Sequence, residues 1–241
     1  MGDVMQDFEE KKYDVLVVGA GAAGMRAAIA ASEEGATVCL VSKSLLGKAH
    51  TVMAEGGAAA ALGNADERDN WKVHFRDTIK GGKHLNNWKM AKIHAEQAPE
   101  RILELEKWGA VFDRTKDGKI NQRNFGGHRF PRLAHVGDRT GLEIIRTVQD
   151  RVIHQNNIDI FMECTVAKII TENNQAVGAL AYYRNNGNIV AILAKAVIVA
   201  TGGIGKAYRV TSNSWEYTGD GHSLAYLAGA DLQDMEFIQF H

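Results

Sequence analysis

Two continuous apolar runs flank an alanine-rich stretch near the beginning of the chain. Residues 13–18 and 37–41 are short and rich in valine, which is typical of fully buried strands. Residues 25–34 between them are rich in alanine, the strongest helix former, and are followed by Gly35, a common helix stop. A strand, a helix and a second strand in this order form a βαβ unit and predict a parallel sheet.

The middle of the chain follows a different pattern. Residues 42–64 are rich in glycine and alanine without a helical period, so we expect extended chain there. Pro99 suits the first turn of a helix, which predicts that a new helix begins at this residue. We therefore expect a helical insertion over about residues 65–155, with helices at residues 66–80, 87–96, 99–107 and 140–155.

The second half changes to the period of strands. Four short runs separated by asparagine-rich turns predict an antiparallel meander at residues 158–162, 166–171, 176–183 and 189–194. Residues 196–200 are predicted to form another buried strand, and residues 221–227 a helix. The predicted fold class is therefore α/β: a dinucleotide-binding βαβ sheet with a helical insertion and an antiparallel β-meander.

Composition excludes several classes of protein. The 28 lysines and arginines nearly cancel the 29 acidic residues, so no basic footprint points to nucleic acid. No apolar run approaches the roughly 18 residues that a membrane span needs, and residues 1–12 do not resemble a secretory signal. Cys39 and Cys164 are too few for a disulfide framework or a cysteine-held metal cluster, and no metal site is predicted.

The glycines after the first strand form the pattern Gly19-x-Gly21-x-x-Gly24. In a dinucleotide site the first glycine permits a tight turn, the second lets the backbone approach a pyrophosphate, and the third lets helix and strand pack closely. The helix N-terminus offers N–H groups to the phosphates. The pattern alone leaves FAD and NAD open. The acidic ribose partner expected after the second strand is replaced by Ser42 and Lys43.

Further blocks carry a resemblance. The run 42–57 is followed by the blocks 138–141, 200–203 and 218–221, and the chain closes with residues 234–241. Together they resemble the flavoprotein subunit of the succinate dehydrogenase and fumarate reductase family, over nearly all of residues 13–241. The resemblance implies a glutathione-reductase-like FAD-binding fold. It implies FAD contacts from Gly19, Ala20, Gly21, Ala22, Ala23, Gly24, Ser42, Lys43, Gly47, Lys48, Ala49, Thr51, Glu55, Gly56, Gly57, Thr201, Gly202 and Asp220.

The resemblance also assigns individual roles. His50 matches the histidine that carries the flavin covalently, and a neutral imidazole is a nucleophile near pH 7; outside this motif it would be interpreted as a solvated loop histidine. For Asp220 a helix N-cap is the alternative to an FAD contact. His241 matches a histidine that binds a substrate carboxylate, and its alternative is a tail residue. A basic stretch suits either the steering of a dianionic substrate or a solvated or partner-facing loop: Arg123, Arg129, Arg132 and Arg139.

The activity that the resemblance implies is FAD-dependent interconversion of succinate and fumarate. Residues 1–236 would form most of an FAD-binding domain and residues 237–241 the start of a capping domain. The proton-transferring arginine of the family lies beyond residue 241, so no catalytic residue is assigned in this chain, and the chain alone is expected to be inactive.

The family also implies partners and a location. The partners are a membrane-anchor subunit together with an iron–sulfur subunit. The location is a peripheral position on the cytoplasmic face of a prokaryotic cell membrane, with the mitochondrial matrix as the alternative. Three alternatives remain: an L-aspartate oxidase-like enzyme, a thiol-driven fumarate reductase, and a non-catalytic flavin-binding fragment.

Overall fold

The computed structural model describes residues 8–239, and the chain divides into two compact units. The first unit combines the chain up to His50 with the chain from Val148 onward, and the second is Thr51–Thr147. The second unit overlaps the insertion predicted at about residues 65–155. The domain boundary predicted between residues 236 and 237 stays a prediction.

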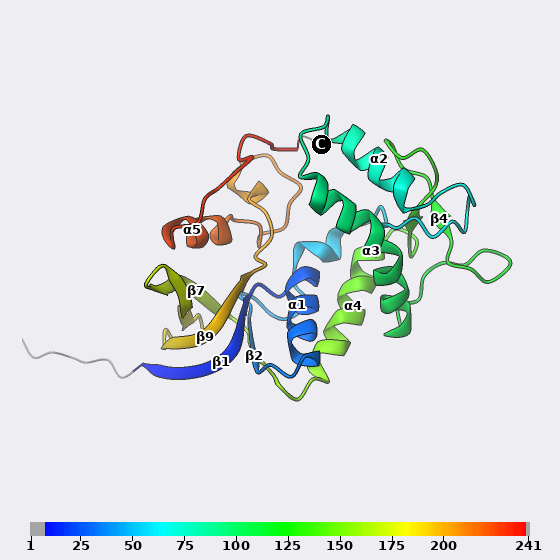
Figure 1. Cartoon of the computed structure of the whole chain (residues 1–241). Coiled ribbons are helices and arrows are strands. Elements are labelled where there is room, and N and C mark those ends of the chain that lie inside the picture. Colours follow the sequence, from blue (N-terminus) through cyan, green and yellow to red (C-terminus); the bar gives the residue numbers. More distant parts are fainter. Residues whose placement is uncertain (1–7, 240–241) are drawn as a thin grey trace, which may run out of the picture. The chain divides into compact units, whose positions relative to one another are not determined.

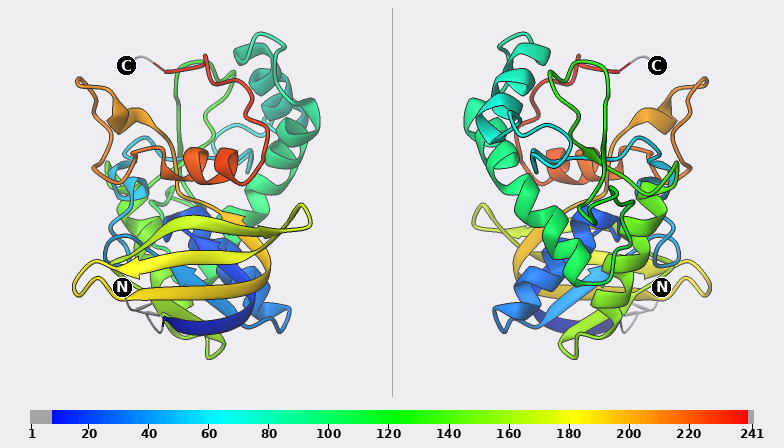
Figure 2. Two further views of the ribbon diagram at one scale, coloured as in Figure 1. Left: turned by 90° about the vertical axis from the view of Figure 1, so that its left-hand side faces the viewer. Right: turned by 90° about the vertical axis from the view of Figure 1, so that its right-hand side faces the viewer.

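The first unit is built on a six-stranded sheet, seen from two sides in Figure 2. The strand order is β6-β2-β1-β9-β8-β7. The pairings among β6, β2, β1 and β9 are parallel, and β8 pairs antiparallel with both β9 and β7. The strands are β1 (Glu9–Val18), β2 (Val38–Val41), β6 (Ile158–Phe161), β7 (Cys164–Glu172), β8 (Gln175–Tyr183) and β9 (Ile189–Val199). Helix α1 (Ala22–Glu33) packs on β1 and β2 (Figure 1), which confirms the βαβ unit.

Strand β6 corrects one part of the predicted meander. It pairs with β2 in parallel, with Val38 opposite Ile158, and so it does not belong to an antiparallel run. The physical reason is its approach: helix α4 (Thr140–Ile153) precedes it, and parallel strands need such a crossover connection. The hairpin between β7 and β8 is as predicted, because Asn173 and Asn174 take the positive φ angles of 48° and 63° that a tight hairpin turn requires.

Strand β9 corrects a second expectation, because it joins two predicted strands into one. No glycine, proline or asparagine interrupts the chain between Ala194 and Ala196, and the strand pairs with β1 along most of its length. Its pairing with β8 ends at Leu193. Ile198 and Val199 are consequently 36% and 40% exposed within the described residues, whereas the sequence predicted a buried strand.

The core of the first unit lies on the sheet. Leu16, Cys39, Val190 and Ile192 are fully buried in one apolar cluster. Helix α5 (Asp220–Leu227) packs against β7 and adds Leu224 to the same cluster, in agreement with the predicted helix (Figure 2). This unit also contains the short 3₁₀ helix η2 (Gly205–Ala207), and the 3₁₀ helix η1 (His50–Met53) begins at its boundary.

The second unit contains two complete helices, the first part of α4 and a small antiparallel sheet. Its elements are α2 (Trp71–Gly81), α3 (Trp88–Lys107), β3 (Ala58–Ala59), β4 (Gln122–Arg123) and β5 (Leu133–Ala134). Its core gathers around Ile102, Phe112 and Ile120. Helix α2 begins later than predicted, because the side chain of Asn70 accepts from the N–H groups of Lys72 and Val73 and caps the helix there.

Pro99 does not begin a helix, because α3 runs through it without a break. A proline inside a helix removes the hydrogen bond to the carbonyl of the residue four positions earlier, here Ala95. Ala95 and Ile102 are nevertheless both buried on the same side as the core. The continuous buried face outweighs the loss of one hydrogen bond.

Candidate functional site

The glycine-rich turn between β1 and α1 is tightly packed against the end of β9. Gly19 has a φ angle of +108°, and its N–H donates to the carbonyl of Val41 at 2.8 Å. A Cβ on Gly19 would overlap the carbonyl oxygen of Ala200, and a Cβ on Gly24 would overlap the carbonyl oxygen of Gly19. The tight turn at Gly19 and the close packing at Gly24 are therefore found as predicted.

The N-terminus of α1 has the chemical character of an anion-binding site. Its N-cap residue is Gly21, in an extended conformation, and a glycine has no side chain with which to cap the helix. Ala20 is buried before the helix, and Ala22 and Ala23 form its first turn. A helix N-terminus presents its first N–H groups and a partial positive charge, which suit a phosphate. The approach of a pyrophosphate to Gly21 stays a prediction.

Lys43 joins the residues after β2 to the turn before α5. Its Nζ lies 2.7 Å from Thr218 Oγ1 and 2.7 Å from Asp220 Oδ2. Burial by itself raises the pKa of Asp220, but the hydrogen bonds from Lys43 and Thr218 outweigh it and hold the pKa below its usual value. The N-cap of α5 is Gly219, so the alternative interpretation of Asp220 as the N-cap is wrong.

Ser42 directly follows β2 and is buried. Its N–H donates to the carbonyl of Phe161 at 2.8 Å, and its hydroxyl accepts from the N–H of Ser44. The following residues form a turn in which the hydroxyl of Ser44 donates to the carbonyl of Lys48 and Gly47 has a φ angle of +82°. Ala49 leads from this turn to His50 and is half-buried.

The two glycine blocks of the second half pack on each other and on a tyrosine. A Cβ on Gly221 would overlap the hydroxyl of Thr201. A Cβ on Gly202 would lie 2.5 Å from the ring of Tyr217, and one on Gly203 would lie 3.0 Å from it. These positions are therefore glycine because the Tyr217 ring lies against their backbone, which the sequence analysis did not anticipate.

His50 is half-buried and held by two contacts within the first unit. Its Nδ1 accepts from the backbone N–H of Ser214 at 3.2 Å. Its ring centroid lies 4.3 Å from that of Tyr217, at an interplanar angle of 44°. Sequence reasoning missed both partners, although Tyr217 directly precedes the block that begins at Thr218.

In the second unit, Arg123 holds the carbonyls of two predicted cofactor residues. Its Nε donates to Gly56 at 2.7 Å, and its Nη2 donates to Glu55 at 2.5 Å. Gly57 has a φ angle of +117°, and a Cβ there would lie 2.9 Å from the carbonyl oxygen of Ala134. The backbone of this segment is thus fixed locally, while its contact with a cofactor stays a prediction.

The block around Gly141 packs on the chain after His50. A Cβ on Gly141 would overlap the carbonyl oxygen of Thr51, and the N–H of Gly141 donates to the carbonyl of Ala54 at 2.7 Å. The block 138–141 and the end of the run 42–57, which are far apart in the sequence, are therefore in direct contact.

The predicted basic stretch separates into buried and exposed arginines. Arg132 is fully buried, with Nη2 at 2.9 Å from Asp69 Oδ1 and 2.8 Å from Asp77 Oδ2, so it does not belong to a solvated loop. Arg129 and Arg139 are exposed. His241, the predicted carboxylate-binding residue, lies outside the described residues.

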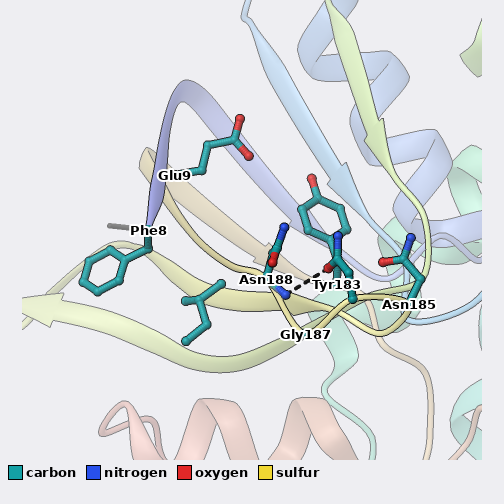
Figure 3. Close-up of a pocket in the computed structure, with 8 residues that line it drawn as sticks. Phe8, Glu9, Tyr183, Asn185, Gly187 and Asn188 are labelled. Carbon is teal, nitrogen blue, oxygen red and sulfur yellow. Dashed lines mark hydrogen bonds between the residues drawn. The ribbon is translucent and has the colours of Figure 1, made fainter. Parts of the chain in front are cut away.

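Other surface features lie apart from these residues. A hollow of about 680 Å³ lies at the β8–β9 turn and includes Phe8, Glu9 and Tyr183 in its lining, but none of the predicted flavin residues (Figure 3). No group of metal-ligating side chains and no helix of membrane-spanning length and hydropathy is found in residues 8–239.

The chain is similar in sequence to known flavoproteins. A family model described as an FAD binding domain matches residues 14–241. The CoM/CoB fumarate reductase of Methanothermobacter marburgensis has a subunit that is 43% identical, over 95% of this chain and 42% of its own length. The succinate dehydrogenase flavoprotein subunit of Rickettsia bellii is 40% identical, over 95% of this chain and 40% of its own.

A solved structure agrees with the sequence comparisons. The Mycobacterium smegmatis Sdh1 complex contains a chain that is 58% identical, with a TM-score of 0.93 over 97% of this chain and 41% of that chain. The chain thus spans about 40% of the length of the relatives it matches. The predicted resemblance and the predicted fold class are confirmed.

Proposed function

The chain belongs to the family of FAD-binding domains found in the flavoprotein subunits of succinate dehydrogenase and fumarate reductase, and we propose that it forms the flavin-binding part of an enzyme that interconverts succinate and fumarate. The convergence of three sequence blocks in the first unit supports this proposal most directly. The turn at Gly19, the Lys43–Asp220 pair and the glycines packed on Tyr217 come together from distant parts of the chain.

The residues present fit FAD. The N-terminus of α1 suits the pyrophosphate, because its N-cap residue Gly21 has no side chain and the helix dipole favours negative charge there. The hydroxyl of Ser42, at the carboxyl end of β2, suits a ribose hydroxyl in place of the usual acidic residue. Bound FAD supplies the redox chemistry, in which two electrons and two protons leave succinate or are returned to fumarate.

His50 carries the flavin covalently in this proposal. Because its Nδ1 already accepts a hydrogen bond, Nε2 is the ring nitrogen left to form the bond. Attachment would join Nε2 to the flavin 8α-methyl carbon with the loss of one proton from each partner, and dioxygen would take up the two electrons released. The chain's contribution is to hold the imidazole in a fixed orientation.

The remaining partners and the location are those of the family. We propose that electrons pass to an iron–sulfur subunit, that a membrane-anchor subunit completes the complex, and that the complex lies on the cytoplasmic face of a prokaryotic membrane. The 43% identity to part of a CoM/CoB fumarate reductase supports a second candidate, in which a thiol-based donor reduces the flavin. Copurification of the native complex distinguishes the two, because each donor requires a different partner subunit.

Cofactor retention tests the proposal. Purified protein is incubated with FAD or NAD and desalted, and we expect FAD alone to be retained. The Gly21→Val variant is expected to lose FAD, because the added side chain would fill the space of the pyrophosphate. Tight retention of NAD without FAD would contradict the proposal.

Acid denaturation tests the attachment. The full-length protein is expected to keep yellow fluorescence on the polypeptide, and a His50→Ala variant is expected to release all of its flavin. An L-aspartate oxidase-like enzyme would release its flavin without any substitution.

A further inference from the structure

We propose that Tyr217 and the backbone amide of Ser214 are positioning elements that fix the orientation and the tautomer of His50. The inference rests on the proposed covalent flavin, but its structural part concerns only residues of the first unit. Neither residue was among those predicted from the sequence.

Tyr217 is held on one side by backbone and contacts His50 on the other. Its ring lies against the backbone of Gly202 and Gly203, where a Cβ would come within 2.5 and 3.0 Å of ring atoms. Its carbonyl accepts from the N–H of Lys206 at 2.9 Å, and its N–H donates to the carbonyl of Ser214 at 3.2 Å. The ring is therefore a fixed surface, and the imidazole of His50 lies 4.3 Å from it, centroid to centroid.

The hydrogen bond from Ser214 decides the tautomer. A backbone N–H can only donate, so Nδ1 of His50 must present its lone pair at 3.2 Å. The proton of the neutral ring then lies on Nε2. Nε2 must give up that proton to solvent before its lone pair can bond to carbon, whereas Nδ1 keeps its own lone pair throughout. The Ser214 hydrogen bond therefore persists unchanged from the free imidazole to the attached one.

The two contacts act on different degrees of freedom. The aromatic contact limits rotation of the His50 ring. The hydrogen bond at Nδ1 occupies that nitrogen and leaves Nε2 as the one that can bond to the flavin. A reacting group that is already oriented reacts faster than a mobile one. Removal of the Tyr217 ring should therefore slow attachment without preventing FAD from binding.

The experiment follows covalent attachment over time in the full-length protein after FAD is added to the apoprotein. We expect Tyr217→Ala to attach flavin at least about tenfold more slowly than wild type, and Tyr217→Phe to attach it at a rate within about twofold, because Phe keeps the ring. Tyr226→Ala is the matched control, since Tyr226 lies in the same unit and is 64% exposed. Non-covalent retention of FAD and the thermal midpoint are measured for each variant.

A second readout needs no flavin. Nitrogen NMR of the His50 ring is expected to show an unprotonated Nδ1 and a protonated Nε2 in wild type and in Tyr217→Phe. In Tyr217→Ala the two nitrogens are expected to average, because a ring that is free to rotate no longer keeps Nδ1 at the Ser214 N–H. Equal attachment rates for wild type and Tyr217→Ala, or identical ring spectra, would overturn this inference. If wild type binds FAD but never attaches it, the covalent proposal fails, and the ring spectra still decide the positioning role.

Discussion

The ammonium group of Lys43 lies 2.7 Å from the carboxylate of Asp220 and connects the end of the second strand to the start of the last helix. The sequence has Ser42 and Lys43 where an acidic ribose partner is expected, and the family resemblance implies an FAD contact from Lys43. Its ion pair shows a second role, because it fixes the position of a residue that is itself a predicted FAD contact. The pair is part-exposed, so its contribution to folding is small.

Lys43→Met is therefore expected to weaken FAD retention more than it weakens the fold. We expect the free energy of unfolding to fall by at most about 1 kcal/mol, as for other part-exposed ion pairs. The dissociation constant for FAD, measured by fluorescence titration, should rise clearly. Lys168→Met is the control, since Lys168 is exposed on β7. An unchanged FAD affinity in Lys43→Met would contradict the role of the pair.

Arg132→Met is expected to destabilise the second unit strongly. The change leaves two carboxylates, Asp69 and Asp77, without their shared buried cation. Breaking a buried pair by removing one partner typically lowers the free energy of unfolding by about 3–5 kcal/mol. Urea denaturation measures the loss. Arg129→Met should cost less than about 1 kcal/mol because its side chain is exposed, and similar losses for both variants would refute the prediction.

Acid should destabilise the protein through His74. Burial, aided by the nearby Arg132, His94 and His128, lowers the pKa of His74 from 6.5 to about 4, while Asp77 opposes the shift. The unfolded chain then binds more protons than the folded one between pH 6.5 and 4, so stability is highest above pH 6.5 and falls as the pH drops. The loss attributable to this group is on the order of 2–3 kcal/mol.

His74→Gln removes this titration and should flatten the dependence of the unfolding free energy on pH in that range. His154 is exposed, so His154→Gln serves as the control and should keep the slope of wild type. A wild-type stability that stays constant between pH 7 and pH 5 would contradict the assignment.

Gly24→Ala should abolish FAD retention and destabilise the first unit, because the new methyl group would overlap the carbonyl oxygen of Gly19. The backbone cannot yield without opening the turn between β1 and α1. Gly81→Ala provides the comparison, since nothing lies within 4 Å of a Cβ there. Thermal unfolding and FAD retention of the two variants should differ widely, and wild-type behaviour of Gly24→Ala would rule out the packing argument.

The sequence was sufficient to predict those helices, strands and turns that are determined by residues next to one another in the chain. The β1–α1–β2 unit follows from valine-rich runs and an alanine-rich stretch, and the β7–β8 turn follows from Asn173 and Asn174. The choice of pairing partner depends on residues that are far apart in the chain. The apolar pattern of residues 158–161 suits pairing with β2 and pairing with β7 equally well, so it could not predict that β6 pairs with β2.

The candidate site also combines features that the sequence predicted with features that it did not. The roles of Gly19 and Gly24 could be predicted because a motif fixes them, whereas the contacts of Tyr217 and Ser214 with His50 could not. These contacts depend on where the loop before α5 lies in space. The burial of Arg132 was likewise hidden, because its partners Asp69 and Asp77 belong to a distant segment.

The pairing of β1 with β9 also determines when the parallel sheet can form during synthesis. Val18 lies opposite Val199, and the whole of the second unit is translated between them. The second unit can therefore collapse on the ribosome while β1 still lacks one neighbour. Such distant pairing raises the contact order, which slows folding and leaves an unpaired strand exposed to other chains in the meantime. Chaperones that shield nascent strands should therefore increase the yield of native protein more than they increase that of a protein with sequential strand pairing.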